Sequence, residues 1–389
     1  MKASDFHLPE ERIDHIFDRP ADSEDRSQTV RESVFGGYPS DLEEPTLVLL
    51  GGQPGAGKSS AIAAVSRERA GELVPLSGDD LRPFHDDFEM LARDHPWLMP
   101  NATSQASGAW VRRCIDYALE NRHSLLLEGV FRDPLTVAQT IDRFAAAGYR
   151  VEVVGVATSY RDSLLASLGR FLHPEEGAAP RWTPATAHDS AYRMVPSALQ
   201  AAEDTEGTQR LHVTTRSGED LHTNTRGPDG RWTDPTPGAA VAAAKTERDA
   251  LPSPGVARAW LRLYVEHTRE LAHRGQVTEP TRPTLDRLAG RAQEAAHIAF
   301  PHAPEARQAI SEHSARLEAT PHDTPRELPN ISLPAAAPEP VTGPRRRRAG
   351  LSAARLENPP TPTRSDTPHM AEPPPQHNLQ RRPGHGLRP

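Results

Sequence analysis

The sequence predicts an α/β fold, a parallel sheet flanked by helices, with a small helical C-terminal appendage and a disordered tail rich in Pro and Arg. Between residues 44 and 235, short apolar runs alternate with stretches of helical periodicity, the pattern of right-handed βαβ units. A glycine-rich turn follows the first of these runs. Residues 321–389 hold 16 prolines and few aromatic side chains, so this tail lacks the side chains that build a core.

Composition and charge divide the chain into four parts. We expect an acidic arm over 1–43, an α/β domain over 44–235, a helical appendage over 252–318 and a disordered Pro-rich tail over 319–389. Residues 1–45 carry 12 acidic and 5 basic side chains. Within the arm, the pattern predicts one helix over Pro9–Phe17 and a loop over Pro20–Pro45.

Each expected strand and helix of the α/β domain follows from a pattern in its own stretch of sequence. The run Thr46–Leu50 is typical of a buried parallel strand. Trp110, Cys114, Tyr117 and Ala118 share one helical face. The expected strands are 46–50, 73–76, 124–127, 151–157 and, as the last, 210–215. The expected helices are 59–70, 106–120, 134–147 (ended by Gly148), 162–172 and 188–203.

The appendage is predicted to be helical from the spacing of its apolar side chains. One helix would carry Trp260, Leu263, Tyr264, His267 and Leu271 on one face, and another would carry Leu285, Leu288, Ala292 and Ala295.

The composition also excludes classes of protein. The 389 residues have a net charge of −8, which argues against nucleic acid as a partner of the whole chain. The single cysteine, Cys114, excludes intrachain disulfides and cysteine-based zinc sites. The N-terminus has no apolar signal region, and no stretch reaches the roughly 18 apolar residues of a membrane span. We therefore expect a cytoplasmic protein.

The most specific motif is Gly52-Gln-Pro-Gly-Ala-Gly57-Lys58-Ser59, which fits the phosphate-binding pattern G-x-x-x-x-G-K-[ST] between a strand and a helix. Its glycines let backbone N–H groups surround phosphate oxygens, and the following helix directs its positive end at them. Lys58 would reach the β- and γ-phosphates of ATP, and Ser59 would hold Mg²⁺. The expected nucleotide-binding residues are Gly52, Gln53, Pro54, Gly55, Ala56, Gly57, Lys58, Ser59 and Ser60.

A second candidate group follows the second strand, in Ser77-Gly-Asp79-Asp80-Leu-Arg82. A carboxylate at the carboxyl end of a strand faces the crevice where ligands bind, so Asp79 is placed to accept a proton from a substrate hydroxyl. One of the two aspartates is also a candidate cap for the next helix. We count Asp80 and Arg82 among the expected substrate-binding residues.

Further charged residues follow later strands. Glu128 is a candidate metal-linked or substrate-binding carboxylate, and Arg132 a candidate anion clamp, although each would also fit a solvated loop. Arg170 and Arg181 would neutralise the charge of a transferring phosphoryl group if they fold over it. Each could equally be an ordinary surface arginine.

In this order the motifs resemble those of the zeta toxins, P-loop kinases of bacterial toxin–antitoxin systems, over about residues 45–235. The matching segments are Gly51–Ser59, Asp79–Arg82 with His85, Glu128-Gly129 with Arg132, Gly148-Tyr149, Leu168–Arg170, and Arg181-Trp-Thr-Pro-Ala-Thr-Ala-His188-Asp189.

The resemblance implies phosphorylation by ATP of the 3′-hydroxyl of UDP-N-acetylglucosamine or a related UDP-amino sugar. By position, Lys58 would bind phosphate, Ser59 would hold Mg²⁺ and Asp79 would be the catalytic base. Arg170 and Arg181 would clamp the transferring phosphoryl group. Glu128 and Arg132 would lie in the sugar-nucleotide pocket. The resemblance also implies a small helical antitoxin that blocks the nucleotide site.

Two departures leave the acceptor open. Val130 stands where the family usually has Thr, and Arg112 lies near the place of a substrate-binding Glu. A kinase acting on another small-molecule hydroxyl, an antibiotic or a metabolite, is therefore one alternative. A non-catalytic ATP-dependent binding module is another. The acidic arm could take the antitoxin's place by folding over the phosphate site, or it could be a solvated arm.

Overall fold

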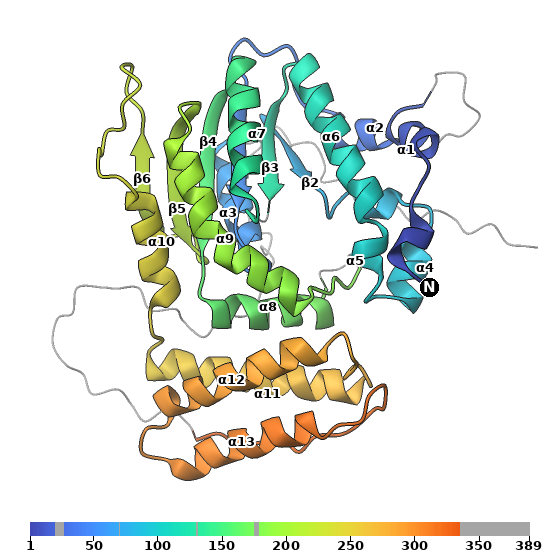
Figure 1. Ribbon diagram of the computed structural model, residues 1–389, viewed down its shortest axis with the longest axis vertical. Coiled ribbons are helices and arrows are strands. Elements are labelled where there is room, and N and C mark those ends of the chain that lie inside the picture. Colours follow the sequence, from blue (N-terminus) through green and yellow to red (C-terminus); the bar gives the residue numbers. More distant parts are fainter. Residues whose placement is uncertain (20–26, 70, 130, 175–178, 335–389) are drawn as a thin grey trace, which may run out of the picture.

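The structure is a computed structural model that describes residues 1–19, 27–69, 71–129, 131–174 and 179–334. Most of the expected disordered tail, from residue 335 onward, lies outside the described residues. The described chain forms a sheet with helices on both faces and a separate layer of helices at one end (Figure 1).

Six strands in the described chain form one sheet in the order β2-β3-β1-β4-β5-β6. Strands β1 to β5 run parallel, and β6 is antiparallel to β5, so the α/β fold is confirmed. The strands are β1 (Thr46–Gly51), β2 (Leu73–Ser77), β3 (Ser124–Gly129), β4 (Arg150–Ala157), β5 (Thr208–Thr215) and β6 (Asp220–Thr225).

The expectation that β5 is the last strand was wrong. The polar sequence of β6, Asp-Leu-His-Thr-Asn-Thr, gives no apolar run because β6 is an edge strand that is mostly exposed or half-buried.

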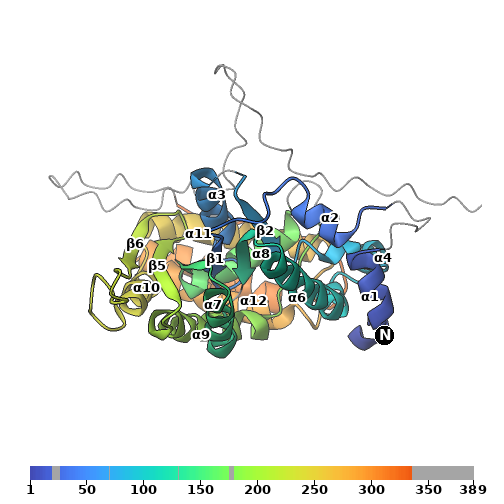
Figure 2. The same ribbon diagram turned by 90° about the horizontal axis from the view of Figure 1, so that it is seen from above.

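Alternating side chains of the central strand enter two different cores. Leu47 and Leu49 pack with the helices of one face, whereas Val48 and Leu50 pack with Ala61 of α3 (Lys58–Glu68) on the other. Figure 2 shows α3 on one side of the sheet and the other flanking helices on the opposite side. Those helices are α6 (Ser104–Glu120), α7 (Pro134–Ala146), α9 (Ala185–Asp204) and α10 (Ala239–Asp249).

The N-terminal arm is more ordered than expected. It contains η1 (Ala3–Phe6), α1 (Glu10–Phe17) and α2 (Val30–Phe35), and α2 lies where we expected only loop. Thr29 caps α2 by accepting a hydrogen bond from the backbone N–H of Glu32 at 3.1 Å. Ile13 is fully buried in the main core, and its carbonyl accepts a hydrogen bond from Trp110 of α6 at 3.0 Å.

Acidic groups of the arm pair with α6. Glu10 and Asp14 both contact the guanidinium group of Arg113. The described helices of the arm therefore pack as part of the α/β core, and these carboxylates do not lie over the phosphate loop.

The C-terminal helices form a layer below the sheet in Figure 1. They are α11 (Pro254–His273), α12 (Arg282–Ala299) and α13 (Pro304–Glu318). Their apolar side chains share one core with those of α8 (Tyr160–Leu172), including Leu164, Leu168 and Phe171. Helix α8 thus lies between the sheet and the helical layer (Figure 1).

Residues 319–334, expected to belong to the disordered tail, pack against this layer. Leu328 is 3% exposed, and its carbonyl accepts a hydrogen bond from Arg269 of α11 at 2.9 Å. This segment has no helical or strand periodicity, because it contacts the layer through single side chains and irregular backbone.

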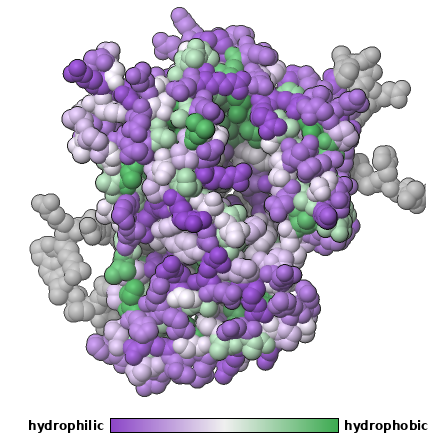
Figure 3. Space-filling view, in the orientation of Figure 1, coloured by the Kyte–Doolittle hydropathy of each residue, from purple (hydrophilic) through white to green (hydrophobic). Residues whose placement is uncertain are grey.

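Short helical segments complete the α/β part between β2 and α6. They are η2 (Arg82–Phe84), α4 (Phe88–Asp94) and α5 (Met99–Ala102). No helix in the described ranges is both long and apolar enough to cross a membrane. The face seen in Figure 3 is mostly hydrophilic, with small separate hydrophobic areas.

Buried histidines predict a pH dependence of stability. Burial lowers the pKa values of His188, His267 and His313 to about 4. In the unfolded chain these groups would titrate near 6.5, so the unfolded state binds more protons between about pH 6.5 and about pH 4. The free energy of unfolding should therefore fall as the pH decreases through this range, by at most about 3 kcal/mol per histidine.

Urea unfolding at about pH 7 and about pH 5 measures this effect. His313 is 1% exposed and contacts Thr268 at 2.8 Å, a contact that the amide of His313→Gln can keep without titrating. This variant should lose less stability on acidification than the wild type. His302→Gln, at an exposed position, is the control and should behave as the wild type. An equal loss in all three proteins would contradict the prediction.

Candidate functional site

The site lies at the carboxyl edge of the sheet, where three neighbouring strands end. Gly51 of β1 pairs with Gly129 of β3, and Ser77 of β2 pairs with Glu128 of β3. The phosphate loop follows Gly51, and Asp79 follows Ser77. The register of parallel strands therefore brings these two segments together beside Glu128.

The phosphate loop has the backbone that its glycines permit. Gly55 and Gly57 have φ angles of +73° and +97°, in the region that side chains disfavour. A Cβ atom on Gly55 would lie 2.1 Å from the carbonyl oxygen of Ser163 in α8. The loop therefore sits directly against α8, and Gly57 leads into α3 as its N-terminal flanking residue.

Lys58 is directed into the loop. Its side chain is 8% exposed, and Nζ donates hydrogen bonds to the carbonyl of Gly52 at 3.1 Å and of Gln53 at 3.4 Å. Nζ also lies 3.5 Å from Oε1 of Glu128. Burial lowers the pKa of Lys58, and Glu128 opposes this by stabilising the charged form. A buried cation beside glycine backbone is suited to bind an anion.

Asp79 is held between two arginines. Its Oδ1 accepts a hydrogen bond from Nε of Arg82 at 2.9 Å, and its Oδ2 lies 2.8 Å from Nη1 of Arg181. Burial acts to raise the pKa of Asp79, but Arg181, Arg82 and Arg170 outweigh it and lower this pKa well below the usual value. Asp79 is therefore an ionised carboxylate at neutral pH.

The two arginines differ in how they are fixed. Arg82 also donates to the carbonyl of Pro100 at 2.5 Å and to Oγ1 of Thr103 at 2.6 Å. Arg181 lies in an irregular segment before α9, with 29% of its side chain exposed. Arg82 thus holds the carboxylate in place, a role that differs from the expected contact with substrate.

Arg170 adds a third positive charge. It lies in the last turn of α8, and its charge lowers the pKa values of both Lys58 and Asp79. The structure thus brings together six charged residues of the expected site: Lys58, Asp79, Arg82, Glu128, Arg170 and Arg181.

Other expected residues lie at the edge of this group. Asp80 is exposed next to Asp79. Arg132 is also exposed, and it forms no hydrogen bond or ion pair with the described residues of the site. Ser59 and Ser60 are exposed in the first turn of α3.

The structure adds contacts that sequence patterns did not indicate. Arg216, directly after β5, donates a hydrogen bond to the carbonyl of Gly55, and its Cγ lies beside Gly57. Thr158, directly after β4, donates to the carbonyl of Ala56 at 2.6 Å. Both residues directly follow strands of the sheet. In the sequence, only this position after an expected strand could have indicated that they lie near the phosphate loop.

His85, which matches the resemblance, has a structural contact. Its Nδ1 accepts a hydrogen bond from the backbone N–H of Asp87, so Nε2 carries the proton and donates to the carbonyl of Phe6 at 2.9 Å. This histidine therefore fastens the N-terminal segment to the chain after β2.

The residues present fit a nucleotide phosphate with Mg²⁺. The glycine cradle of the loop has no room for Cβ atoms, and the cations around it would balance phosphate charge. Among the described residues there is no group of three or more His, Cys, Asp or Glu that could hold a metal ion. A Mg²⁺ ion bound through phosphate oxygens, water and the Ser59 hydroxyl needs no such group.

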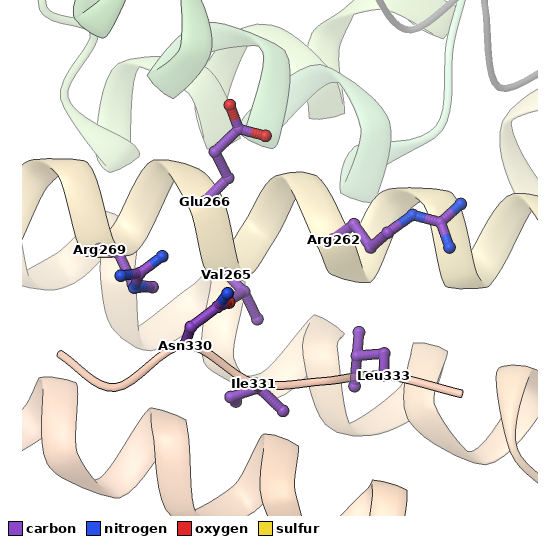
Figure 4. Close-up of a pocket in the computed structure, with 7 residues that line it drawn as sticks. All are labelled: Arg262, Val265, Glu266, Arg269, Asn330, Ile331 and Leu333. Atoms are coloured by element: carbon purple, nitrogen blue, oxygen red, sulfur yellow. The ribbon is translucent and has the colours of Figure 1, made fainter. Parts of the chain in front are cut away.

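A separate cavity of about 260 Å³ lies on the helical layer, between α11 and residues 330–333. Figure 4 shows Arg262, Glu266 and Arg269 of α11 on one side and Ile331 and Leu333 on the other. None of its lining residues belongs to the phosphate loop, so this cavity is not part of the site.

The contact between the loop and α8 predicts the effect of a substitution. Gly55→Ala should destabilise the protein more than Gly230→Ala, although both glycines have nearly the same φ angle, +73° and +74°. A Cβ on Gly230 meets nothing within 4 Å, so Gly230→Ala should lower the free energy of unfolding only by the penalty for its backbone conformation, about 1 kcal/mol. The difference in the free energy of unfolding between the variants measures the clash with Ser163. Equal losses would contradict this packing.

Comparison with known proteins finds a matching family model and similar curated proteins. The family model described as "Zeta toxin" matches residues 28–226. "Toxin zeta" of Enterococcus hirae is 26% identical over 189 residues, which cover 48% of this chain and 66% of that protein. "Toxin PezT" of Streptococcus pneumoniae is 26% identical over 176 residues, which cover 44% of this chain and 68% of that protein.

A solved structure from the PezAT chromosomal toxin–antitoxin system of Streptococcus pneumoniae has the same fold. It matches with a TM-score of 0.54 and 20% identity, over 68% of this chain and 98% of that one. The chain spans just under two thirds of the length of the zeta toxin relative from Enterococcus hirae. The family model covers just over half of the 389 residues, and the protein therefore belongs to the zeta toxin family.

Proposed function

We propose that this protein is an ATP-dependent phosphotransferase that phosphorylates a hydroxyl group of UDP-N-acetylglucosamine or a related UDP-amino sugar. The observation that supports this most strongly is the ionised Asp79 carboxylate, held by Arg82 and Arg181 beside the phosphate loop with its buried Lys58. Membership of the zeta toxin family supports it independently.

In this proposal ATP, when bound with Mg²⁺, supplies the phosphoryl group. Backbone N–H groups of the loop and Lys58 bind its phosphates, while the Ser59 hydroxyl contributes to the Mg²⁺ ion. Arg170 and Arg181 balance the negative charge that spreads over the phosphoryl oxygens during transfer.

Asp79 orients the acceptor hydroxyl and receives its proton at a carboxylate oxygen. In the structure Arg82 and Arg181 each occupy one of these oxygens. Because Arg82 has additional anchors, Arg181 is the partner that we infer exchanges from Asp79 to the phosphate. That exchange frees Oδ2 and relieves part of the lowering of the Asp79 pKa, which makes the carboxylate a better base.

Glu128 would lie on the substrate side of Lys58, as would Asp80 at the exposed edge. The acceptor is the least constrained part of the proposal. Arg112 is exposed on α6, near the place of a family carboxylate. This difference in charge favours, as a second candidate, a kinase acting on another small-molecule hydroxyl.

We also propose a small helical antitoxin as a partner. Support comes from the matched structure, which belongs to a toxin–antitoxin system. The described N-terminal helices do not take this place, because α1 packs on α6 through Arg113 and Trp110.

Incubation of the protein with ATP, Mg²⁺ and a panel of UDP-sugars tests the reaction, with a gain of one phosphate in mass as the readout. The panel also includes hydroxyl-bearing antibiotics and metabolites for the second candidate. ATP binding with no phosphorylated product and no ATP consumption would favour a non-catalytic binding module instead.

Asp79→Asn should retain ATP affinity and lower turnover by about 10²–10⁴-fold, because the amide cannot accept the proton. Lys58→Ala should abolish turnover, since it removes the cation inside the loop. Asp94→Asn, at an exposed carboxylate of α4, is the control and should leave turnover unchanged. Steady-state kinetics with the best acceptor measures all three, and full turnover of Asp79→Asn would rule out Asp79 as the base.

A further inference from the structure

The phosphate loop rests on the segment that joins β4 to α8. The Gln53 side chain is fully buried, and its Nε2 donates to the carbonyl of Thr158 at 2.8 Å and to Oγ of Ser163 at 3.3 Å. Gly55 meets the backbone of the same Ser163. The conformation of the loop therefore depends on where Ser163 holds Gln53.

Ser163 in turn contacts His188 of α9. The Oγ of Ser163 lies 3.0 Å from Nε2 of His188 and donates its own proton to the carbonyl of Ser159 at 2.9 Å. The carbonyl of Tyr160, 3.2 Å away, is a second acceptor for the same proton. Because a hydroxyl has a single proton, Oγ accepts from its two nitrogen partners. Nε2 of His188 and Nε2 of Gln53 are therefore both donors to Ser163.

This assignment fits the surroundings of His188. Its ring is 0% exposed, and Nδ1 has no hydrogen-bond partner among the described residues. An unprotonated Nδ1 leaves only an unpaired acceptor, whereas the other tautomer would bury an N–H group with nothing to receive it. The rings of Tyr160 and Tyr192 lie 5.1 Å and 6.3 Å from the His188 ring between centroids. The lowered pKa of His188, about 4, keeps the ring neutral in this apolar setting.

The residue after His188 fixes this part of α9 from the other side. Asp189 accepts a hydrogen bond from the hydroxyl of Tyr160 at 2.6 Å and another from Nε of Arg287 in α12 at 2.9 Å. The start of α9 is thus held to both α8 and the helical layer, and these contacts fix the position of His188.

We propose that His188 is a positioning residue for the phosphate loop: by donating to Ser163 it fixes the acceptor that holds Gln53, and so holds the loop against α8 in the conformation that binds the nucleotide. The last part of this inference rests on the proposed function, in which the nucleotide is ATP. The positioning of the loop itself does not depend on that function.

Two pairs of variants test the chain of hydrogen bonds. Ser163→Ala removes the shared acceptor, and Ser107→Ala is its control, because Oγ of Ser107, buried in α6, donates to the backbone of its own helix at 3.4 Å. His188→Leu removes the donor, whereas the side-chain amide of His188→Gln can place an N–H group near the position of Nε2.

The first readout is hydrogen exchange of the backbone amides of residues 53–57 in the nucleotide-free protein. Exchange should be faster in Ser163→Ala and His188→Leu, by roughly 5- to 10-fold for the loss of one buried hydrogen bond, and unchanged in Ser107→Ala and His188→Gln. Unchanged exchange in Ser163→Ala, or equally fast exchange in His188→Gln and His188→Leu, would overturn the inference. If His188→Leu does not fold, Ser163→Ala still decides.

The second readout is the affinity for ATP with Mg²⁺, measured by calorimetry. We expect it to weaken by about 10-fold in Ser163→Ala and His188→Leu, with the KM for ATP rising while kcat changes less. The double variant should bind no more weakly than either single variant, because both act on one contact. If Ser163→Ala bound ATP with wild-type affinity, the inference that this contact prepares the loop for nucleotide binding would be overturned. A wild-type protein that binds no ATP would instead contradict the proposed function, and the exchange experiment would still test the loop.

Discussion

The close approach of the phosphate loop to α8 is the contact on which the site depends. It is possible because Gly55 has no Cβ, which would otherwise lie 2.1 Å from the carbonyl oxygen of Ser163. The hydroxyl of Thr158 and the side chain of Gln53 close the same contact from the end of β4. Since backbone atoms form both sides, small movements of α8 are transmitted directly to the loop.

The electrostatics of the site follow from this packing. The same α8 that supports the loop carries Arg170 in its last turn, where its charge acts on Lys58 and Asp79. Lys58 and the three arginines around Asp79 outnumber the two carboxylates, Asp79 and Glu128, so the group has an excess of positive charge. Such an excess attracts phosphate groups in a protein whose overall charge is −8.

The helical layer is more than an appendage to the sheet. Apolar side chains of α8 share its core, and Trp260 of α11 donates to the carbonyl of Arg161 at 3.3 Å. Gly169, next to Arg170, lies against the ring of His267 in α11, where a Cβ would be only 2.7 Å away. The layer therefore fixes α8 from the side opposite the phosphate loop.

The sequence alone determined the elements whose side chains repeat with a clear period and the motif whose chemistry is local. Buried strands such as Thr46–Gly51 have continuous apolar runs, and the glycines and lysine of the phosphate loop lie within one short segment. These features depend on neighbours in the chain, so they are visible without the fold. The polar edge strand Asp220–Thr225 and the short helix Val30–Phe35 lack such a period and were missed.

Only the tertiary structure decided which charged side chains meet. Arg82 and Arg181 both reach Asp79, although Arg181 is far from it in the sequence, while Arg132 remains exposed. The contacts of Arg216 with Gly55 and of His188 with Ser163 depend on how strands pair and how α9 packs on α8. A residue's type says that it can form an ion pair or a hydrogen bond, but the partner is set by the docking of distant elements, which no local pattern records.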